Sequence, residues 1–390
     1  MGYPKVLLLL DEIPQSVNAG CIQFYRLFKN WPAEQLLVIG RAPSDKADKL
    51  RCVYHTLTYP FFDRWRLTRF SKQLSDAEAL GLIDYKLPRR LAVIADQFQP
   101  DVVVTLMQLF MYYRPAYHYA KSRKLPLVVF CHDDAEDFSR VSPSLLKRMV
   151  SKNTEVYQFA KKRICISPEM AKAWEVKYGL EGDFLYPVAS ESIQPRAMEE
   201  NLVPREDGFL TFGFAGSLAY GYLEGISELM PFLVESRVKI RIYRDPDDRM
   251  PAHQQIEFCG YAPTPEATWE RIKRECDAVL LPYSFQERFK SVYSTHFPSK
   301  LPEYLRLGMP VVVRGPEYAT GVSWSMRNPG TVLASNSNSK VSWLELIAHL
   351  FSSAIREKLI FHDSVGEQFS LAEAKAELSN HLHSLVKSSS

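Results

Sequence analysis

Short apolar runs alternate with helical patterns along almost the whole chain, and this alternation constrains the fold more than any other feature. In the first half, strands are expected at 5–10, 35–39, 51–58, 101–105, 126–131 and 163–166, with helices at 19–30, 88–98, 112–124 and 143–161. The runs are continuous rather than alternating apolar and polar, which indicates strands covered on both faces. Such strands separated by helices predict an α/β, doubly wound parallel sheet.

The alternation lapses in the polar stretch 188–208, which holds two prolines and is predicted to be a linker. A second series follows, with strands expected at 209–215, 238–243, 255–259, 277–281 and 310–314, helices at 222–235, 264–276 and 299–307, and a helical tail at 340–387. We therefore predict two Rossmann-like domains, 1–187 and 209–365, that face a cleft. Ligands of such sheets bind beyond the carboxyl ends of the strands.

Composition excludes several classes of protein. Of the 390 residues, 46% are hydrophobic and 24% charged, as in soluble globular proteins. No run approaches the ~18 apolar residues of a spanning helix, and the run 6–10 is too short for a signal peptide. Six cysteines without a Cys-x-x-Cys pair fit reduced thiols better than disulfides or a zinc site. We expect a cytoplasmic protein, at most peripheral on a membrane.

Positive charge is concentrated in the first half. Residues 1–190 carry 27 basic and 20 acidic residues, whereas the whole chain has a net charge of only +3. Within that half, "FFDRWRLTRFSK" (61–72) interleaves aromatic residues with arginines, including Arg64 and Arg66. The segment suits an anionic membrane surface or an anionic acceptor. A surface helix with arginines extended over an apolar face is the alternative.

The stretch "HFPSKLPEYLRLGMPVVV" (296–313) contains the strongest local signal of a site. Ser299 suits an N-cap, Pro302 falls in the first turn, and Gly308 ends the helix. Backbone N–H groups, the Ser299 hydroxyl and the Lys300 ammonium suit a diphosphate. Glu303 lies one turn further, where its carboxylate suits a vicinal diol. The alternative is a capped helix with a solvated lysine and glutamate.

This stretch resembles the "S-K-L-x-E-Y-L-x-x-G-x-P-V-V" signature of retaining GT-B glycosyltransferases of the large family 4 group. Other segments resemble that family in the same order: "KRICISPEMAKAWEVKYG" (162–179), "GFAGSLAYG" (213–221), "CDAVLLPYS" (276–284) and "GEQFSLAEAKAEL" (366–378). The resemblance spans nearly the whole chain. It implies the GT-B fold, in which the C-terminal helix, here 366–390, crosses back to the first domain.

The resemblance also implies roles for individual residues. Glu303 would bind the donor ribose, and Ser299 and Lys300, with the backbone of Gly216 and Ser217, would hold the diphosphate. In "FCHDDAEDF" (130–138), His132 would act near the transferred sugar, and the adjacent Asp133 and Asp134 would orient His132 or an acceptor hydroxyl. A histidine satisfied at a strand end and a solvated acidic cluster are the alternatives. The acceptor-side loop would be "QSVNAG" (15–20), with Asn18 and Gly20. Arg64 and Arg66 are assigned to the acceptor side from the pattern of 61–72 itself and not from the resemblance.

Two departures from the family pattern concern the donor. Thr295 stands where a glutamate contact to the sugar is expected, so His296 or Ser294 would have to substitute. The glycine loop lacks the usual Arg and Lys, so Arg244, Arg288 or Lys290 would have to supply the charge. "DPDD" (245–248) has the spacing of a metal-binding motif but is interpreted as a loop turn. We expect no metal and no cofactor, since the nucleotide-sugar is a substrate.

These observations predict a retaining glycosyltransferase that moves a sugar from a nucleotide diphosphate donor to a glycan or lipid-linked acceptor. A UDP-sugar is the favoured donor. Synthesis of cell-surface polysaccharide or glycoconjugate is the expected setting. The alternatives are a GT-B UDP-sugar epimerase and a non-catalytic scaffold that binds sugar nucleotides or glycans. No segment resembles a nucleic-acid-binding module, so no nucleic-acid partner is expected.

Overall fold

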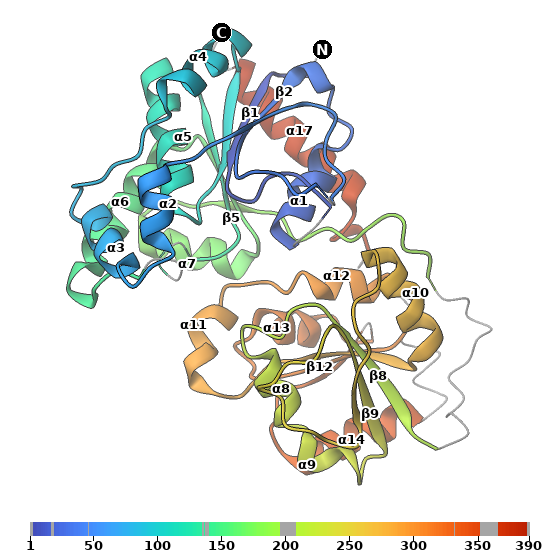
Figure 1. Ribbon diagram of the computed structural model, residues 1–390. Coiled ribbons are helices and arrows are strands. Elements are labelled where there is room, and N and C mark those ends of the chain that lie inside the picture. Colours follow the sequence, from blue (N-terminus) through green and yellow to red (C-terminus); the bar gives the residue numbers. More distant parts are fainter. Residues whose placement is uncertain are drawn as a thin grey trace. The chain divides into compact units, whose positions relative to one another are not determined.

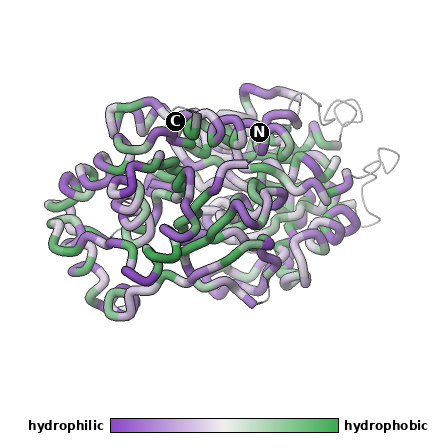
Figure 2. Tube along the Cα trace, turned by 90° about the horizontal axis from the view of Figure 1, so that it is seen from above, coloured by the Kyte–Doolittle hydropathy of each residue, from purple (hydrophilic) through white to green (hydrophobic). Residues whose placement is uncertain are grey.

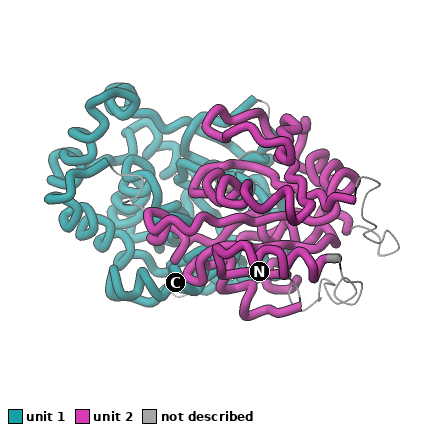
Figure 3. Tube along the Cα trace, turned by 90° about the horizontal axis from the view of Figure 1, so that it is seen from below, with its two compact units in different colours: residues 1–186, 371–390 teal, residues 187–370 magenta. Residues whose placement is uncertain are grey.

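The computed structural model describes residues 3–16, 19–45, 47–134, 136, 140–195, 208–330, 332–351 and 366–387. The chain forms two compact units, 1–186 with 371–390 and 187–370 (Figure 3). Residues 187–195 of the stretch around the predicted linker belong to the second unit, and 196–207 lie outside the described residues.

The described residues of the first unit form a seven-stranded sheet in the order β3-β2-β1-β4-β5-β6-β7, with every ladder parallel. The strands are β1 Val6–Leu10, β2 Leu36–Gly40, β3 Val53–Thr56, β4 Val102–Leu106, β5 Leu127–Cys131, β6 Lys162–Cys165 and β7 Asp183–Phe184. From β1, the sheet continues through β2 and β3 on one side and through β4 to β7 on the other. The switch point, where a doubly wound sheet opens a crevice, therefore lies between β1 and β4.

The helices of this unit are α1 Ala19–Phe28, α2 Pro60–Arg66, α3 Ser71–Ala79, α4 Arg89–Phe98, α5 Phe110–Arg123, α6 Leu146–Phe159, α7 Pro168–Tyr178 and α17 Leu371–Lys387, with 3-10 turns at Ala33–Gln35 and Pro143–Leu145. All residues of β1, β2, β4 and β5 are buried, which explains their unbroken apolar runs. The C-terminal helix α17 packs against α1 and β4, as the family resemblance implied (Figure 1).

The second unit repeats this winding in a sheet of the order β10-β9-β8-β11-β12-β13, again with parallel ladders. Its described strands are β8 Leu210–Ala215, β9 Val238–Tyr243, β10 Ile256–Phe258, β11 Ala278–Pro282, β12 Val311–Arg314 and β13 Leu333–Ser335. Its helices include α8 Tyr222–Ser227, α9 Met230–Leu233, α10 Pro265–Glu275, α11 Lys290–Tyr293, α12 Lys300–Leu305, α13 Thr320–Arg327 and α14 Lys340–Phe351, with a 3-10 turn at Glu287–Phe289. The switch point of this sheet lies between β8 and β11.

The expected α/β fold class, two doubly wound sheets, is confirmed, and most strand bounds lie within a residue or two of the prediction. Apolar stretches (green) alternate with polar ones (purple) along the trace in Figure 2. The helix expected over 222–235 was wrong, because the structure has two short helices, α8 and α9, instead. Pro231 has no amide hydrogen and cannot continue α8. Helix α13 and strand β13 were not predicted.

The expected N-cap at Ser299 was also wrong. Ser299 itself has helical backbone angles (φ −61°, ψ −15°), and its side chain makes no capping hydrogen bond. The turn is closed instead by the Leu301 N–H, which donates to the Pro298 carbonyl at 3.0 Å. The other end follows the prediction, since Gly308 has φ +65°, in the left-handed region that glycine favours.

Candidate functional site

The carboxyl ends of β8 and β11 form the switch point of the second unit, and the loops that follow them carry the candidate donor site. Gly216 comes directly after β8 and has φ +97°, which L side chains rarely adopt. A Cβ atom at this position would lie 3.2 Å from Cε and 3.7 Å from Nζ of Lys300. The glycine therefore lets the lysine side chain lie close against the backbone after β8.

Lys300 comes from α12, which the core of the second unit holds in place. Leu301 and Tyr304 are fully buried, and burial of each such side chain stabilises the fold by about 1.5–3 kcal/mol. The Ala215 N–H donates to the Tyr304 hydroxyl at 3.1 Å, which ties α12 to the last residue of β8. The lysine is thereby fixed beside the glycine loop.

Aromatic rings, rather than acids, surround the Lys300 ammonium. Its Nζ lies 4.3 Å from the ring centroid of Tyr222 and 5.3 Å from that of Phe214. Within the described residues, Lys300 has no hydrogen bond and no ion pair. Burial lowers the pKa of Lys300 to about 8. The second unit thus holds a partly desolvated cation beside the end of β8 with no carboxylate to neutralise it, which favours binding of an anion.

Glu303 lies one turn after Ser299 on α12, and its side chain is buried. The Ser190 N–H donates to its Oε2 at 3.1 Å, so the carboxylate is engaged by the segment that begins the second unit. The sequence had left Glu303 without a partner within the fold, and the structure supplies one. Ser299 is half-buried, and Ser217 is exposed, its hydroxyl accepting from the Ala219 N–H at 3.1 Å.

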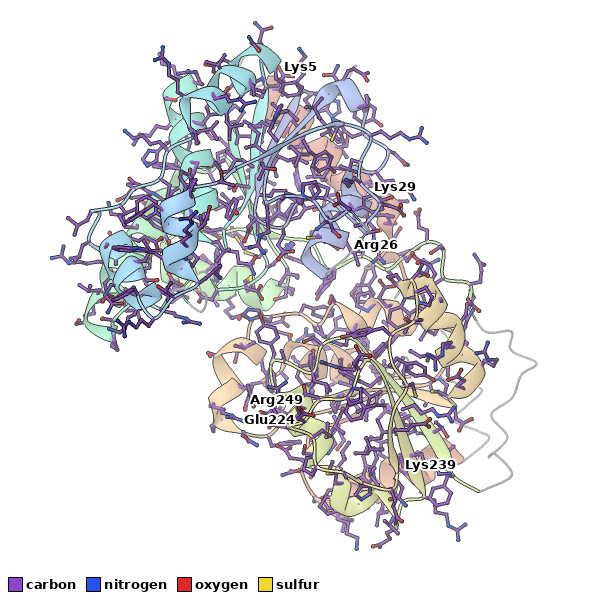
Figure 4. The ribbon with its side chains drawn as sticks, viewed as in Figure 1. Lys5, Arg26, Lys29, Glu224, Lys239 and Arg249 are labelled. Atoms are coloured by element: carbon purple, nitrogen blue, oxygen red, sulfur yellow. The ribbon has the colours of Figure 1, made fainter. Side chains whose placement is uncertain are left out.

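The other cations expected near the phosphates have acidic neighbours. Arg244 Nη2 lies 3.9 Å from Asp247, and exposed Lys290 lies 3.3 Å from Glu287. Arg288 pairs at 2.6 Å with Glu224, which Figure 4 labels on α8. Of the cations named from the sequence for this site, the structure therefore leaves Lys300 alone without a carboxylate among the described residues.

Sequence reasoning missed Arg314, the last residue of β12, which is fully buried. Its Nη1 lies 3.8 Å from Glu228, its Nη2 donates to Asn338, and burial lowers its pKa to about 10. Glu228 also accepts from the Ser284 hydroxyl at 2.6 Å and from the Phe285 N–H at 3.1 Å. This network fixes the loop after β11. The only signal in the sequence was an arginine ending the run "VVVR".

In the first unit, His132 and Asp133 follow β5, as expected. The His132 ring stacks on Phe24 of α1, with centroids 5.5 Å apart. Asp133 accepts from Gln108 Nε2 at 2.9 Å, and Gln108 itself lies two residues after β4. The structure therefore places both predicted residues after β5, and Asp133 is tied to the neighbouring end of β4 through Gln108.

The adjacent Asp134 and Glu136 form an ion cluster with Lys177 of α7, which the sequence did not predict. Lys177 Nζ donates to Asp134 at 2.6 Å and also to Glu136. Burial and the Asp134 charge raise the pKa of Glu136 to about 7. Burial opposes ionisation of Asp134, but hydrogen bonding with Glu136 and the Lys177 charge lower its pKa below the usual value. The two carboxylates in turn raise the pKa of Lys177 against its burial.

A second buried carboxyl in this unit is Asp11, directly after β1. Burial and the neighbouring Glu12 raise its pKa to about 7, although the charge of Arg41 works in the opposite direction. The sequence showed Asp11 only as the end of an apolar run. Its position at the β1 end of the switch point becomes visible once the strand order is known.

The residues expected on the acceptor side are dispersed in the first unit. Gly20 lies in the first turn of α1, where a Cβ would come within 3.0 Å of Glu12 Oε2. Arg64 is exposed on α2, whereas Arg66 pairs with buried Glu78 at 2.6 Å. Asn18 lies outside the described residues.

In the described parts of the chain, no three histidine, cysteine or acidic side chains gather closely enough to hold a metal ion. Within "DPDD", Asp247 instead pairs with Arg249 at 2.7 Å. Among the described helices, none is long and apolar enough to cross a membrane. None of the six cysteines, all of which lie in the described residues, forms a disulfide bond.

Comparison with known proteins assigns the fold. The family pattern Glycosyltransferase Family 4 matches residues 38–184. The crystal structure of Anabaena Alr3699/HepE in complex with UDP and glucose is similar, with a TM-score of 0.62, 13% identity and coverage of 98% of this chain and 100% of that chain. A glycosyltransferase from Rickettsia africae has a TM-score of 0.61 and 12% identity, covering 99% of both chains.

A candidate UDP-N-acetylglucosamine 2-epimerase from Listeria monocytogenes is also similar, with a TM-score of 0.53, 10% identity and coverage of 98% of this chain and 97% of that chain. A search of curated protein sequences finds no significant match. The chain has the GT-B fold. The resemblance to family 4-like glycosyltransferases that its motifs predicted is confirmed.

Proposed function

We propose that the protein is a retaining glycosyltransferase that takes a sugar from a nucleotide diphosphate donor, with a UDP-sugar as the favoured donor. The observation that carries the proposal is the Lys300 ammonium, which lies beside Gly216 at the end of β8 without an acid partner among the described residues. A cation left in this state is stabilised by a bound diphosphate. The structure of Alr3699/HepE with UDP and glucose supports the choice of UDP.

The chemistry of the transfer fits these residues. Departure of a nucleoside diphosphate develops negative charge, and a fixed cation with backbone N–H groups stabilises it. We assign Lys300 and the backbone of Gly216 and Ser217 to the diphosphate, with the Ser299 hydroxyl beside them. The buried Glu303 carboxylate is assigned to the ribose hydroxyls.

Arg244 and Lys290 are secondary candidates, because each would have to exchange a carboxylate, Asp247 or Glu287, for the ligand. Since Lys300 supplies positive charge at the diphosphate, we propose that transfer needs no metal ion. Undiminished turnover in the presence of EDTA is the expected result, and a loss that Mg²⁺ restores would contradict it.

For the first unit we propose that His132 acts at the transferred sugar and that Asp133 orients an acceptor hydroxyl. The acceptor is proposed to be a glycan or a lipid-linked glycan, in the synthesis of cell-surface polysaccharide or glycoconjugate. Peripheral attachment to an anionic membrane belongs to the same proposal, because a lipid-linked acceptor lies at such a surface. A reducing, cytoplasmic compartment is also proposed, because six cysteines without a Cys-x-x-Cys pair fit reduced thiols.

The test is a panel of UDP-, GDP- and TDP-sugars, incubated with a cell extract as the source of acceptor, with release of nucleoside diphosphate as the readout. The wild type should release the diphosphate from at least one donor, and Lys300→Met should abolish it. Lys239→Met is the matched control, since Lys239 (labelled in Figure 4) also lies over an aromatic ring of the second unit, 4.7 Å from the centroid of Phe209. No release from any donor would contradict the proposal.

The same panel separates the alternatives. An epimerase, favoured by the structural similarity to the Listeria protein, would convert a UDP-sugar without an acceptor and without net release of UDP. A non-catalytic scaffold would bind UDP but release nothing. His132→Ala should lower transfer while leaving UDP affinity unchanged, and an unaffected rate would remove His132 from the site.

A further inference from the structure

Helix α2 and the loop that leads to α3 expose large apolar side chains next to one another. Phe61 is 58% exposed, Trp65 38%, Leu67 90% and Phe70 43%. Together with Arg64 and Arg69 they form what we call the aromatic–basic patch. Large apolar side chains usually lie buried in a core, so four exposed ones within ten residues indicate an interaction surface.

The side chains of the patch form one continuous surface. The ring centroids of Phe61 and Trp65 lie 4.7 Å apart, and those of Trp65 and Phe70 6.3 Å apart. The guanidinium of Arg69 lies 5.0 Å from the Phe70 centroid. A hollow of about 430 Å³ is lined by Phe61, Arg64 and Trp65 together with Pro60.

The opposite side of α2 is anchored in the unit, so the exposure does not come from a loosely attached helix. Phe62 packs against the core of the first unit, and its ring centroid lies 5.4 Å from that of Tyr85. Arg66 pairs with buried Glu78, and the Tyr59 N–H donates to Asp63 at 2.8 Å. The inner face of the helix is used for folding, and its outer face is left apolar and basic.

The charges of the patch differ from those beside it. Lys72 lies 3.6 Å from Asp76 and Arg66 pairs with Glu78. Arg64 and Arg69, in contrast, make no ion pair with any described residue. The patch therefore presents net positive charge among its apolar side chains, and the first half of the chain has an excess of seven basic residues.

We propose that the aromatic–basic patch docks on an anionic lipid surface. Its aromatic and leucine side chains suit the boundary between headgroups and acyl chains, where tryptophan in particular is favoured. The two unpaired arginines suit lipid phosphates, each contributing on the order of 1 kcal/mol near an anionic leaflet. The inference deepens the membrane attachment in the proposed function by assigning it to these residues, and its test does not depend on transferase activity, since lipid binding needs no donor.

The test is co-sedimentation of the full chain with phosphatidylcholine vesicles that contain increasing fractions of phosphatidylglycerol. The bound fraction should rise with phosphatidylglycerol and fall as salt is raised from 0.05 to about 0.5 M, because salt screens the arginines. Leu67→Ser/Arg69→Glu should reduce binding at least tenfold. Val93→Ser/Arg90→Glu is the matched control, as both residues are exposed on α4 and Val93 is 48% exposed.

Wild type that does not sediment with anionic vesicles, or binds pure phosphatidylcholine equally well, would overturn the proposal. Equal loss in the α4 control would also overturn it. Dimers that dissociate in Leu67→Ser/Arg69→Glu, measured by sedimentation velocity, would assign the patch to a second copy of the chain instead. Release of nucleoside diphosphate without vesicles should be unchanged in this variant, so failure of lipid binding and failure of the transferase proposal are separate results.

Discussion

Two partly buried lysines, one in each unit, have opposite electrostatic surroundings. Lys177 lies between two carboxylates, Asp134 and Glu136, which raise its pKa above the ordinary value. Lys300 lies between two aromatic rings, and burial lowers its pKa to about 8. Both ammonium groups lose hydrating water on folding. Only Lys177 replaces the lost hydration by ion pairs within its own unit.

The difference separates a structural charge from a functional one. A desolvated cation without a partner costs stability, and such groups concentrate at functional sites. Lys177 ties Asp134 and Glu136, which follow His132 and Asp133 in the chain, to α7. Lys300 is left for a ligand. Four predictions test this distinction, beginning with the largest expected effect.

Lys177→Met should lower the free energy of unfolding by about 2–3 kcal/mol, since it leaves two carboxylates facing each other without their cation. Lys300→Met should leave stability unchanged or raise it, because it removes a desolvated charge that has no partner. Chemical denaturation of both variants measures the contrast. Exposed Lys172→Met on the same helix α7 is the control, and a loss in Lys300→Met equal to that in Lys177→Met would refute the distinction.

UDP affinity should fall about tenfold between pH 7 and pH 9, because a lysine whose pKa is about 8 loses its proton across this range. Lys300→Arg should flatten the profile, since a guanidinium stays charged. Calorimetric titration at each pH provides the affinities. An unchanged slope in Lys300→Arg would assign the pH dependence to another group.

Glu136→Gln should change the pH dependence of stability by on the order of 1 kcal/mol. The folded pKa of Glu136, about 7, lies above its ordinary value of 4.5. The folded state therefore binds the extra proton between these values, and the stability that Glu136 contributes decreases as pH rises from about 4.5 to 7. Thermal melts from pH 5 to 8 should show a smaller decline in the variant. A decline equal to wild type would show that Glu136 titrates normally.

Tyr222→Leu should weaken UDP binding by two- to fivefold, since a cation–π contact contributes about 0.5–1 kcal/mol to the position of a cation. The ring lies 4.3 Å from Lys300 Nζ and is expected to hold the ammonium over Gly216. Tyr222→Phe keeps the ring and should bind UDP like wild type. Equal weakening in both variants would point to the hydroxyl instead.

Much of the fold could be predicted from the sequence because its strands are buried on both faces. Continuous runs such as 126–131 mark a strand without ambiguity, and the stop at Gly308 needed only the preference of glycine for positive φ. The break at Pro231 could have been read from the sequence, because proline has no amide hydrogen. The uncapped start at Ser299 depended on local hydrogen bonds that the pattern alone does not specify.

The site was harder to predict because its charges are set by distant contacts. Lys177 follows Asp134 by more than forty residues, and nothing local distinguishes it from a solvated lysine. The buried Arg314 and Asp11 likewise become recognisable only when strand order brings the loops together. Lys300 could be named from its motif, but its lack of a carboxylate partner required the structure.

The central claim is that the Lys300 ammonium binds the diphosphate of a nucleotide, and calorimetric titration with UDP and with uridine tests it most directly. Wild type and Lys239→Met should bind UDP alike. Lys300→Met should bind it about 10- to 100-fold more weakly, as expected for the loss of a hydrogen bond between charged groups. Uridine, which has no phosphate, should bind all three proteins equally. Equal UDP affinity in Lys300→Met and wild type would contradict the account.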